Sequence, residues 1–187
     1  MQALWVAVIS LVSVSCTTLS PVSAATPATF IRGYPRVIDG DSLEINDMSI
    51  RLEAIDAPEM RQTCYDSSGT PYKCGVESRN QLLKKISNSR VACSLNREDR
   101  FGRSLGYCSI DRPGVSSVDP AKSLNAWMVR SGQAMAYRRF TTMFVPQEDY
   151  ARSQNLGIWS GEFLEPWVWR QTYGRGGDGQ SPDTSKP

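Results

Sequence analysis

Apolar and polar residues alternate along short segments in the first half of the chain, and this alternation predicts β-strands. The segments are 36–38, 42–45 and 49–55, and the turn-forming pair Asn46-Asp47 separates the last two. These three segments predict a meander. Two further strands are expected over about 90–96 and 103–110, so the pattern indicates five short strands in all.

Helical patterns predict three helices, over about 75–87, 119–132 and 146–156. The second begins at Asp119-Pro120, a capping residue followed by proline, and Gly132 ends it. Three strands, a helix, two strands and two helices indicate an α+β protein with a small barrel or sheet. This order is compatible with a five-stranded OB-type barrel with three helices.

The two ends of the chain have a different composition from the centre. Residues 1–24 carry no charge and end in Val22-Ser23-Ala24, a small-x-small pattern typical of a secretory signal peptide. A membrane anchor is the alternative, but the apolar run is shorter than the roughly 20 residues that a span needs. Residues 174–187 offer nothing to bury and are expected to form a flexible tail. We therefore expect one folded domain over 25–173.

Removal of the signal peptide leaves four cysteines, an even number that favours two disulfides in an exported protein. Cys93 and Cys108 fall on two strands expected to be neighbours, and Cys64 and Cys74 flank a turn-rich segment. We therefore predict the pairs Cys64–Cys74 and Cys93–Cys108. Four free thiols in a cytosolic protein, or a zinc site without paired CxxC spacing, are the alternatives.

The chain of 187 residues contains no histidine, which excludes every mechanism that needs an imidazole. Carboxylates, lysine, tyrosine, a thiol or metal-bound water must supply any acid–base chemistry. The 21 basic and 19 acidic residues leave a net charge of +2. This charge is too small to argue for a polyanionic ligand, so a local basic patch would have to bind one.

Charged residues recur at four places where strands and turns alone do not require them. They are Asp39-Gly40-Asp41, Arg51, Asp56-Ala57-Pro58-Glu59 and the segment 97–103 that includes Arg103. Each has an ordinary explanation as a turn, a solvated loop or a solvent-facing strand position. Together, the carboxylates are suited to Ca²⁺ or Mg²⁺, and the two arginines are suited to a phosphate.

Three segments closely resemble the staphylococcal nuclease (thermonuclease) family over about residues 34–160. They are Ile38-Asp39-Gly40-Asp41-Ser42, Ile50-Arg51-Leu52-Glu53-Ala54-Ile55-Asp56-Ala57-Pro58-Glu59 and Asp99-Arg100-Phe101-Gly102-Arg103-Ser104-Leu105-Gly106-Tyr107. The spacing of Arg51, Asp56, Pro58 and Glu59, followed by Gly102-Arg103, is specific as a set. The resemblance implies an exported bacterial member with a five-stranded OB-fold barrel and three helices.

The resemblance also implies a Ca²⁺-dependent endonuclease that cleaves DNA and RNA and leaves 3′-phosphate ends. It implies that the carboxylates of Asp41 and Asp56 and the main-chain carbonyl of Ala57 bind Ca²⁺. Glu59 is then expected to act on the attacking water, and Arg51 and Arg103 on the phosphate. Arg100 and Tyr137 match positions that contact nucleotide phosphate in the family.

Phe101 departs from the family, where a tyrosine is common, so stacking is kept while a hydroxyl is lost. The cysteine pairs are additional to the staphylococcal pattern and fit a secreted or periplasmic protein. We expect a monomer that needs no protein partner. The alternative function is a non-catalytic OB module that binds single-stranded nucleic acid or protein. The tryptophans at 159, 167 and 169 are interpreted as a clasp packed on the barrel rather than as base-stacking residues.

Overall fold

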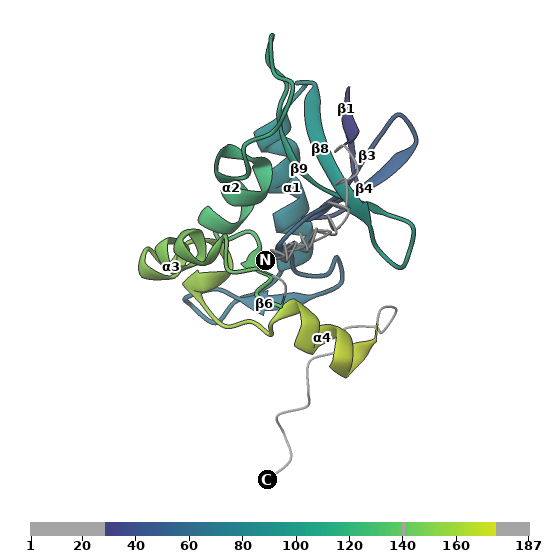
Figure 1. Ribbon diagram of the computed structural model, residues 1–187. Helices are drawn as coiled ribbons and strands as arrows, with labels where there is room; N and C mark the ends of the chain where they lie inside the picture. Colours follow the sequence, from purple (N-terminus) through teal and green to yellow (C-terminus); the bar gives the residue numbers. More distant parts are fainter. Residues whose placement is uncertain (1–28, 140, 175–187) are drawn as a thin grey trace, which may run out of the picture.

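A six-stranded curled sheet organises the computed structural model, which describes residues 29–139 and 141–174 (Figure 1). The strands are β1 (Thr29–Gly33), β2 (Arg36–Val37), β3 (Ser42–Ile45), β4 (Met48–Leu52), β8 (Val91–Glu98) and β9 (Ser104–Ile110). Their order is β1-β8-β9-β4-β3-β2. All neighbours are antiparallel except β4 and β9, which run parallel.

Two small two-stranded sheets complete the β structure. The first pairs β5 (Ile55–Asp56) with β10 (Met135–Ala136), and the second pairs β6 (Thr63–Tyr65) with β7 (Pro71–Lys73). The helices are α1 (Cys74–Ile86), α2 (Leu124–Arg130), α3 (Val145–Ser153) and α4 (Pro166–Tyr173). Short 3₁₀ turns cover Pro120–Lys122 and Gly157–Ser160. Figure 1 shows α4 standing apart from the other three helices.

The sheet curls so strongly that β1 comes close to β3. Gly33 at the end of β1 lies so close to β3 that a Cβ atom there would be 2.6 Å from the side chain of Ile45. Between β3 and β4, Asn46 and Asp47 both have positive φ, at 49° and 63°. A pair of residues with this backbone makes the tight hairpin turn that follows the right-handed twist of a sheet.

The core lies between the concave face of the sheet and helices α1 and α2. Alternate residues of β3 and β4 point into it, so that Leu43, Ile50 and Leu52 have no exposed surface. Asn125 of α2 is also completely buried, and its amide fastens the helix to the sheet. It donates to the carbonyls of Glu53 and Gly106 and accepts from the main-chain N–H of Cys108.

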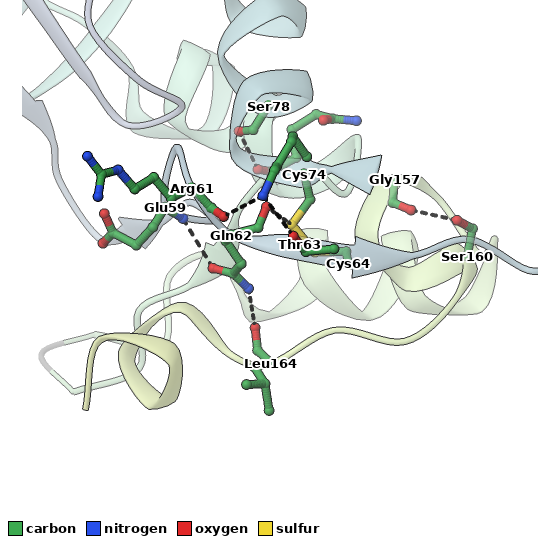
Figure 2. The surroundings of a disulfide bond; sticks show 12 residues. Glu59, Arg61, Gln62, Thr63, Cys64, Cys74, Ser78, Gly157, Ser160 and Leu164 are labelled. Carbon is green, nitrogen blue, oxygen red and sulfur yellow. Dashed lines mark hydrogen bonds between the residues drawn. A yellow bond between two sulfur atoms is a disulfide. The ribbon is translucent and has the colours of Figure 1, made fainter. Parts of the chain in front are cut away.

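Both disulfides form as predicted, Cys64 with Cys74 and Cys93 with Cys108. The second joins residues that face each other in the register of β8 and β9. The first ties β6 to the start of α1 (Figure 2). Two disulfides are typical of an extracellular or periplasmic protein. Among the described helices, none is long and apolar enough to cross a membrane.

The α+β class and the OB-type architecture are confirmed, with three differences in detail. The regular part of the second helix is shorter than predicted, because Asp119 caps a 3₁₀ turn and Ser123 then caps α2. Strand β1 and the four short strands were not predicted, and neither was α4. The expected signal peptide (1–24) and nearly all of the expected tail (174–187) lie outside the described residues.

Candidate active site

A cleft of about 750 Å³ opens beside β4 and β9, and residues from distant parts of the chain line it. Those that the sequence singled out are Asp41, Arg51, Ala57, Glu59, Arg100, Arg103 and Tyr137. The eighth, Asp56, lies directly behind this lining, hydrogen-bonded to Arg51. The fold therefore brings together all eight residues for which a catalytic, metal-binding or substrate-binding role was expected.

Arg51 on β4 joins the two aspartates at the floor of the cleft. Its Nη1 donates to Oδ1 of Asp41 and its Nη2 donates to Oδ1 of Asp56, each at 2.8 Å. Burial lowers the pKa of Arg51, but the charges of the two aspartates outweigh that effect and raise it. The arginine within the alternating strand thus faces the cleft rather than the solvent.

Asp41 is held in place by a main-chain N–H from the segment after β5 and by the hydroxyl of the next residue. Its Oδ2 accepts a hydrogen bond from the main-chain N–H of Ala57 at 2.9 Å, and its Oδ1 accepts one from the Ser42 hydroxyl at 3.1 Å. The preceding residue, Gly40, passes so close to Ser78 of α1 and to Ala57 that a Cβ atom would overlap both. This glycine lets the aspartate loop approach the segment that follows β5.

Asp56 is completely buried at the end of β5. Burial and the charge of Asp41 both raise the pKa of Asp56. Hydrogen bonds from Arg170 and the charges of Arg51 and Arg170 lower the pKa, but the net shift is upward. At the rim, burial and the nearby carboxylate of Asp41 raise the pKa of Asp39 to about 7. Both shifts arise because carboxyl groups lie close together in a poorly hydrated place, where a nearby cation stabilises their charged forms.

Glu59 lies at the edge of the cleft, with its side chain one-third exposed. Its main-chain N–H donates to Oε1 of Gln62 at 3.1 Å. Gly75, at the start of α1, touches the carbonyl of Glu59 so closely that any side chain at Gly75 would clash. These two contacts fix the backbone of Glu59, while its carboxylate remains accessible from the cleft.

Arg103 enters the cleft from the start of β9, and Asp99 holds it there. The guanidinium donates to Oδ2 of Asp99 from Nε at 2.9 Å, with Nη2 at 2.7 Å. Oδ1 of the same aspartate accepts from the main-chain N–H groups of Phe101 and Arg103. Phe101 is half exposed, and the guanidiniums of Arg100 and Arg103 lie over its ring at 4.7 and 5.6 Å.

Arg170 of α4 is a member of the site that sequence reasoning missed. It donates from Nη1 and Nη2 to the two carboxylate oxygens of Asp56, at 3.1 and 2.7 Å, and from Nη1 to Oε1 of Glu59 at 2.8 Å. The one available signal was that an arginine directly follows the tryptophan-rich run, which was interpreted as a packed clasp rather than as a base-stacking surface. That clasp does form, since Trp169 is buried and Trp167 lies 6.2 Å from Tyr137, ring centre to ring centre.

The segment that carries Arg170, residues 161–173, is fastened to the loop that carries Glu59. We call it the C-terminal strap. Tyr65 and Glu162 exchange two main-chain hydrogen bonds at 2.8 and 3.0 Å. Figure 2 shows Gln62 between Glu59 and Leu164, where its Nε2 donates to the Leu164 carbonyl at 2.6 Å. The strap and the Glu59 loop are therefore joined through main-chain groups as well as through Arg170.

The donor set fits a hard divalent cation. Within residues 29–139 and 141–174, no three His, Cys, Asp or Glu side chains form a ready-made metal cluster. Asp41 and Asp56 are nevertheless both buried, and both already bind the same guanidinium. Buried carboxylates that face a common positive charge offer the oxygen ligands that Ca²⁺ and Mg²⁺ prefer, with carbonyls and water completing the shell.

Comparison with known proteins is consistent with this geometry. The model of the family described as "Staphylococcal nuclease homologue" matches residues 49–161, more than half of the chain. A micrococcal nuclease of Shigella flexneri is 32% identical over 161 residues, which cover 80% of this chain and 86% of the relative. An uncharacterized endonuclease of Escherichia coli O157:H7 is 32% identical, with 72% of this chain and 81% of the relative covered.

A third relative carries a different name. The succinoglycan biosynthesis protein ExoI of Rhizobium meliloti (strain 1021) is 35% identical over 131 residues, or 69% of this chain. The match spans only 64% of that relative's own length. The family match extends from β4 to the 3₁₀ turn before the strap, and the charged cleft lies on an OB-type barrel. The chain therefore belongs to the staphylococcal nuclease family of phosphodiester hydrolases.

Proposed function

We propose that this protein is a Ca²⁺-dependent endonuclease that hydrolyses phosphodiester bonds of DNA and RNA and leaves 3′-phosphate ends. The observation that carries the proposal is the bridge from Arg51 to two buried aspartates, in a cleft that Glu59 and Arg103 also line. The names of the nuclease and endonuclease relatives support the same chemistry.

Asp41 and Asp56 would hold Ca²⁺ through their carboxylates, and Ala57 through its main-chain carbonyl. The bound ion would neutralise charge on a phosphate oxygen and make a nearby water more acidic. The buried position of both aspartates supports this role, because buried carboxylates are stabilised by cationic partners that replace the lost hydration. A carbonyl ligand at position 57 does not depend on the side chain, so alanine is acceptable there.

Glu59 would accept a proton from the attacking water, whose oxygen then bonds to phosphorus. The bond from phosphorus to the 5′ oxygen breaks, and that oxygen takes a proton from solvent. Arg51 and Arg103 would donate hydrogen bonds to the phosphate oxygens as charge develops on them. Arg51 is rigidly held, as preorganised stabilisation requires, and Asp99 supports Arg103 in the same way.

Arg100 and Tyr137 would extend the binding surface along the nucleic-acid backbone, and Phe101 would stack on a base. Their positions on the cleft wall support these roles. We further propose a signal peptide over 1–24, a nuclease domain over 25–173 and a flexible tail over 174–187. The two disulfides support the secreted or periplasmic location of a monomer that needs no protein partner.

Digestion of covalently closed circular DNA by the purified protein tests this function. We expect nicked and linear products with Ca²⁺ and none after EGTA is added. The fragments should resist extension by a DNA polymerase until a phosphatase removes the 3′-phosphate. A parallel digestion of RNA tests the second substrate. Undiminished cleavage in EGTA would rule out the metal role, and DNA binding without cleavage would favour the non-catalytic OB module.

A further inference from the structure

Arg170 occupies the same carboxylate oxygens that a metal ion would need. Its guanidinium binds Oδ1 and Oδ2 of Asp56 at 3.1 and 2.7 Å, and it reaches Oε1 of Glu59 at 2.8 Å. Arg51 also binds Oδ1 of Asp56 at 2.8 Å. Both oxygens of this buried carboxylate therefore already have a cationic partner.

The position of Arg170 is built into the fold and is not an accident of a long surface side chain. Only 21% of the side chain is exposed. Trp169 beside it is buried, and Pro166 at the start of α4 is buried as well. Gln62 ties the strap to the Glu59 loop from the other side. The helix thus delivers one guanidinium to one place.

The charges of the site show what this guanidinium does. Asp41, Asp56 and Glu59 contribute three negative charges, and Arg51 is shared between the two aspartates. Without Arg170, the only cationic partner of the completely buried Asp56 would be Arg51, which Asp56 shares with Asp41. A buried carboxylate that is incompletely paired destabilises the folded state. A dication placed on the same oxygens would meet Arg170 within a few ångströms, where like charges repel strongly.

Of the two arginines on Asp56, Arg170 is the one that can yield. Arg51 projects from the centre of the sheet and also binds Asp41, so its departure would unpair two buried carboxylates. Arg170 projects from a terminal helix, and its other partner, Glu59, is one-third exposed. Glu59 can therefore be solvated when the guanidinium leaves.

We propose that Arg170 is a positioning residue that serves as the resident counter-cation of the site. It holds Asp56 and Glu59 in place without metal, and it competes with Ca²⁺ for Asp56, so it sets the affinity of the site for the ion. This inference rests on the proposed function, because it assumes that Asp56 is a Ca²⁺ ligand. The competing group belongs to the chain itself, on a segment far from the ligands in sequence.

Calorimetric titration of the full chain with Ca²⁺, in the absence of nucleic acid, tests the inference. We expect Arg170→Gln to bind Ca²⁺ about fivefold or more tightly than the wild type. Its melting temperature without metal should fall by several degrees, whereas a larger Ca²⁺-induced rise should restore part of that loss. A purely structural role would lower stability with and without Ca²⁺ and would leave the affinity unchanged.

Two further variants make the test specific. Arg130→Gln removes the same charge from α2, where the guanidinium lies over Tyr150 outside the cleft, and should leave the affinity for Ca²⁺ unchanged. Arg170→Lys keeps the charge but loses the two-pronged contact. It should bind Ca²⁺ more tightly than the wild type, which keeps the test decisive even if the glutamine variant does not fold.

The outcomes separate this inference from the proposed function. Wild-type binding of Ca²⁺ with no tightening in Arg170→Gln or Arg170→Lys overturns the counter-cation role alone. Absence of binding in the wild type and in both variants overturns the metal site and the inference together. Binding by the Arg170 variants but not by the wild type supports both, with the arginine as the dominant competitor.

Discussion

Gln62 and Leu164 lie 102 positions apart in sequence, yet the Nε2 of Gln62 donates to the carbonyl of Leu164 at 2.6 Å. The glutamine is completely buried, and its Oε1 accepts the main-chain N–H of Glu59 at 3.1 Å (Figure 2). One side-chain amide therefore links the loop of the proposed general base, Glu59, to the C-terminal strap.

Replacement of Gln62 by alanine should lower the free energy of unfolding by about 1–3 kcal/mol, because it removes two part-buried hydrogen bonds, each worth about 0.5–1.5 kcal/mol. Urea unfolding followed by tryptophan fluorescence measures this change. The matched control is Gln171→Ala on exposed α4 surface, for which we expect almost no effect. Equal stabilities of the two variants would show that the amide bridge contributes little.

Glu59→Gln should reduce the rate of DNA cleavage by about 100-fold or more, as expected when a general base is lost. The glutamine oxygen can still accept from Arg170, so the melting temperature should change little. Single-turnover cleavage at saturating Ca²⁺ measures the effect. Glu165→Gln, an exposed residue of the strap, is the control and should retain wild-type activity.

Asp99→Asn should slow cleavage by about tenfold while leaving Ca²⁺ affinity unchanged, because it loosens Arg103 without touching the metal ligands. Asp47→Asn, in the exposed turn between β3 and β4, removes the same charge and should have no such effect. A loss of Ca²⁺ affinity in Asp99→Asn would contradict a role confined to Arg103.

The same aspartate gives a pH signature. Burial raises the pKa of Asp99, but hydrogen bonds from the main chain and side chain of Arg103 outweigh it and lower the pKa below its ordinary value. The folded state therefore favours the carboxylate, and its contribution is present above the unfolded pKa of about 3.9 and lost as pH falls through the lower folded value. The stability difference between wild type and Asp99→Asn should be constant above about pH 5 and shrink below about pH 4.

Removal of the disulfide between β8 and β9, by replacing Cys93 and Cys108 with alanine, should destabilise the protein by about 3 kcal/mol. The bond closes a loop of 15 residues, and both cysteines are completely buried. Denaturant unfolding under non-reducing conditions checks the value. An unchanged midpoint would mean that residual contacts between these two segments already restrict the unfolded chain as much as the covalent bond does.

Strands with local signals could be predicted from sequence. The alternation in 42–45 and 49–52 and the turn residues Asn46 and Asp47 act within a few positions, and the structure forms that hairpin. Strand β1 has no comparable signal, because Thr29–Gly33 is half exposed and acquires its role only by pairing with β8. Short strands such as β5 and β10 likewise depend on partners about 80 positions away.

The residues of the candidate site also differ in whether a local sequence signal predicts them. Asp41, Arg51, Asp56 and Glu59 lie within 19 positions, and their spacing is a motif that can be read directly from the chain. Arg170 follows Glu59 by 111 positions and belongs to a helix whose tryptophans drew attention to packing alone. An ion pair of that separation depends on the folded barrel, so an arginine beside the tryptophan run does not by itself indicate which carboxylates it binds.

The late position of Arg170 also has a consequence for how the protein is made. Synthesis proceeds from the N-terminus, so all the side chains proposed to act on phosphate leave the ribosome before the strap does. A nascent chain that ends before residue 161 would possess Asp56 and Glu59 but not the guanidinium that balances them. The second cationic partner of Asp56 is thus supplied by one of the last segments of the proposed domain to be translated.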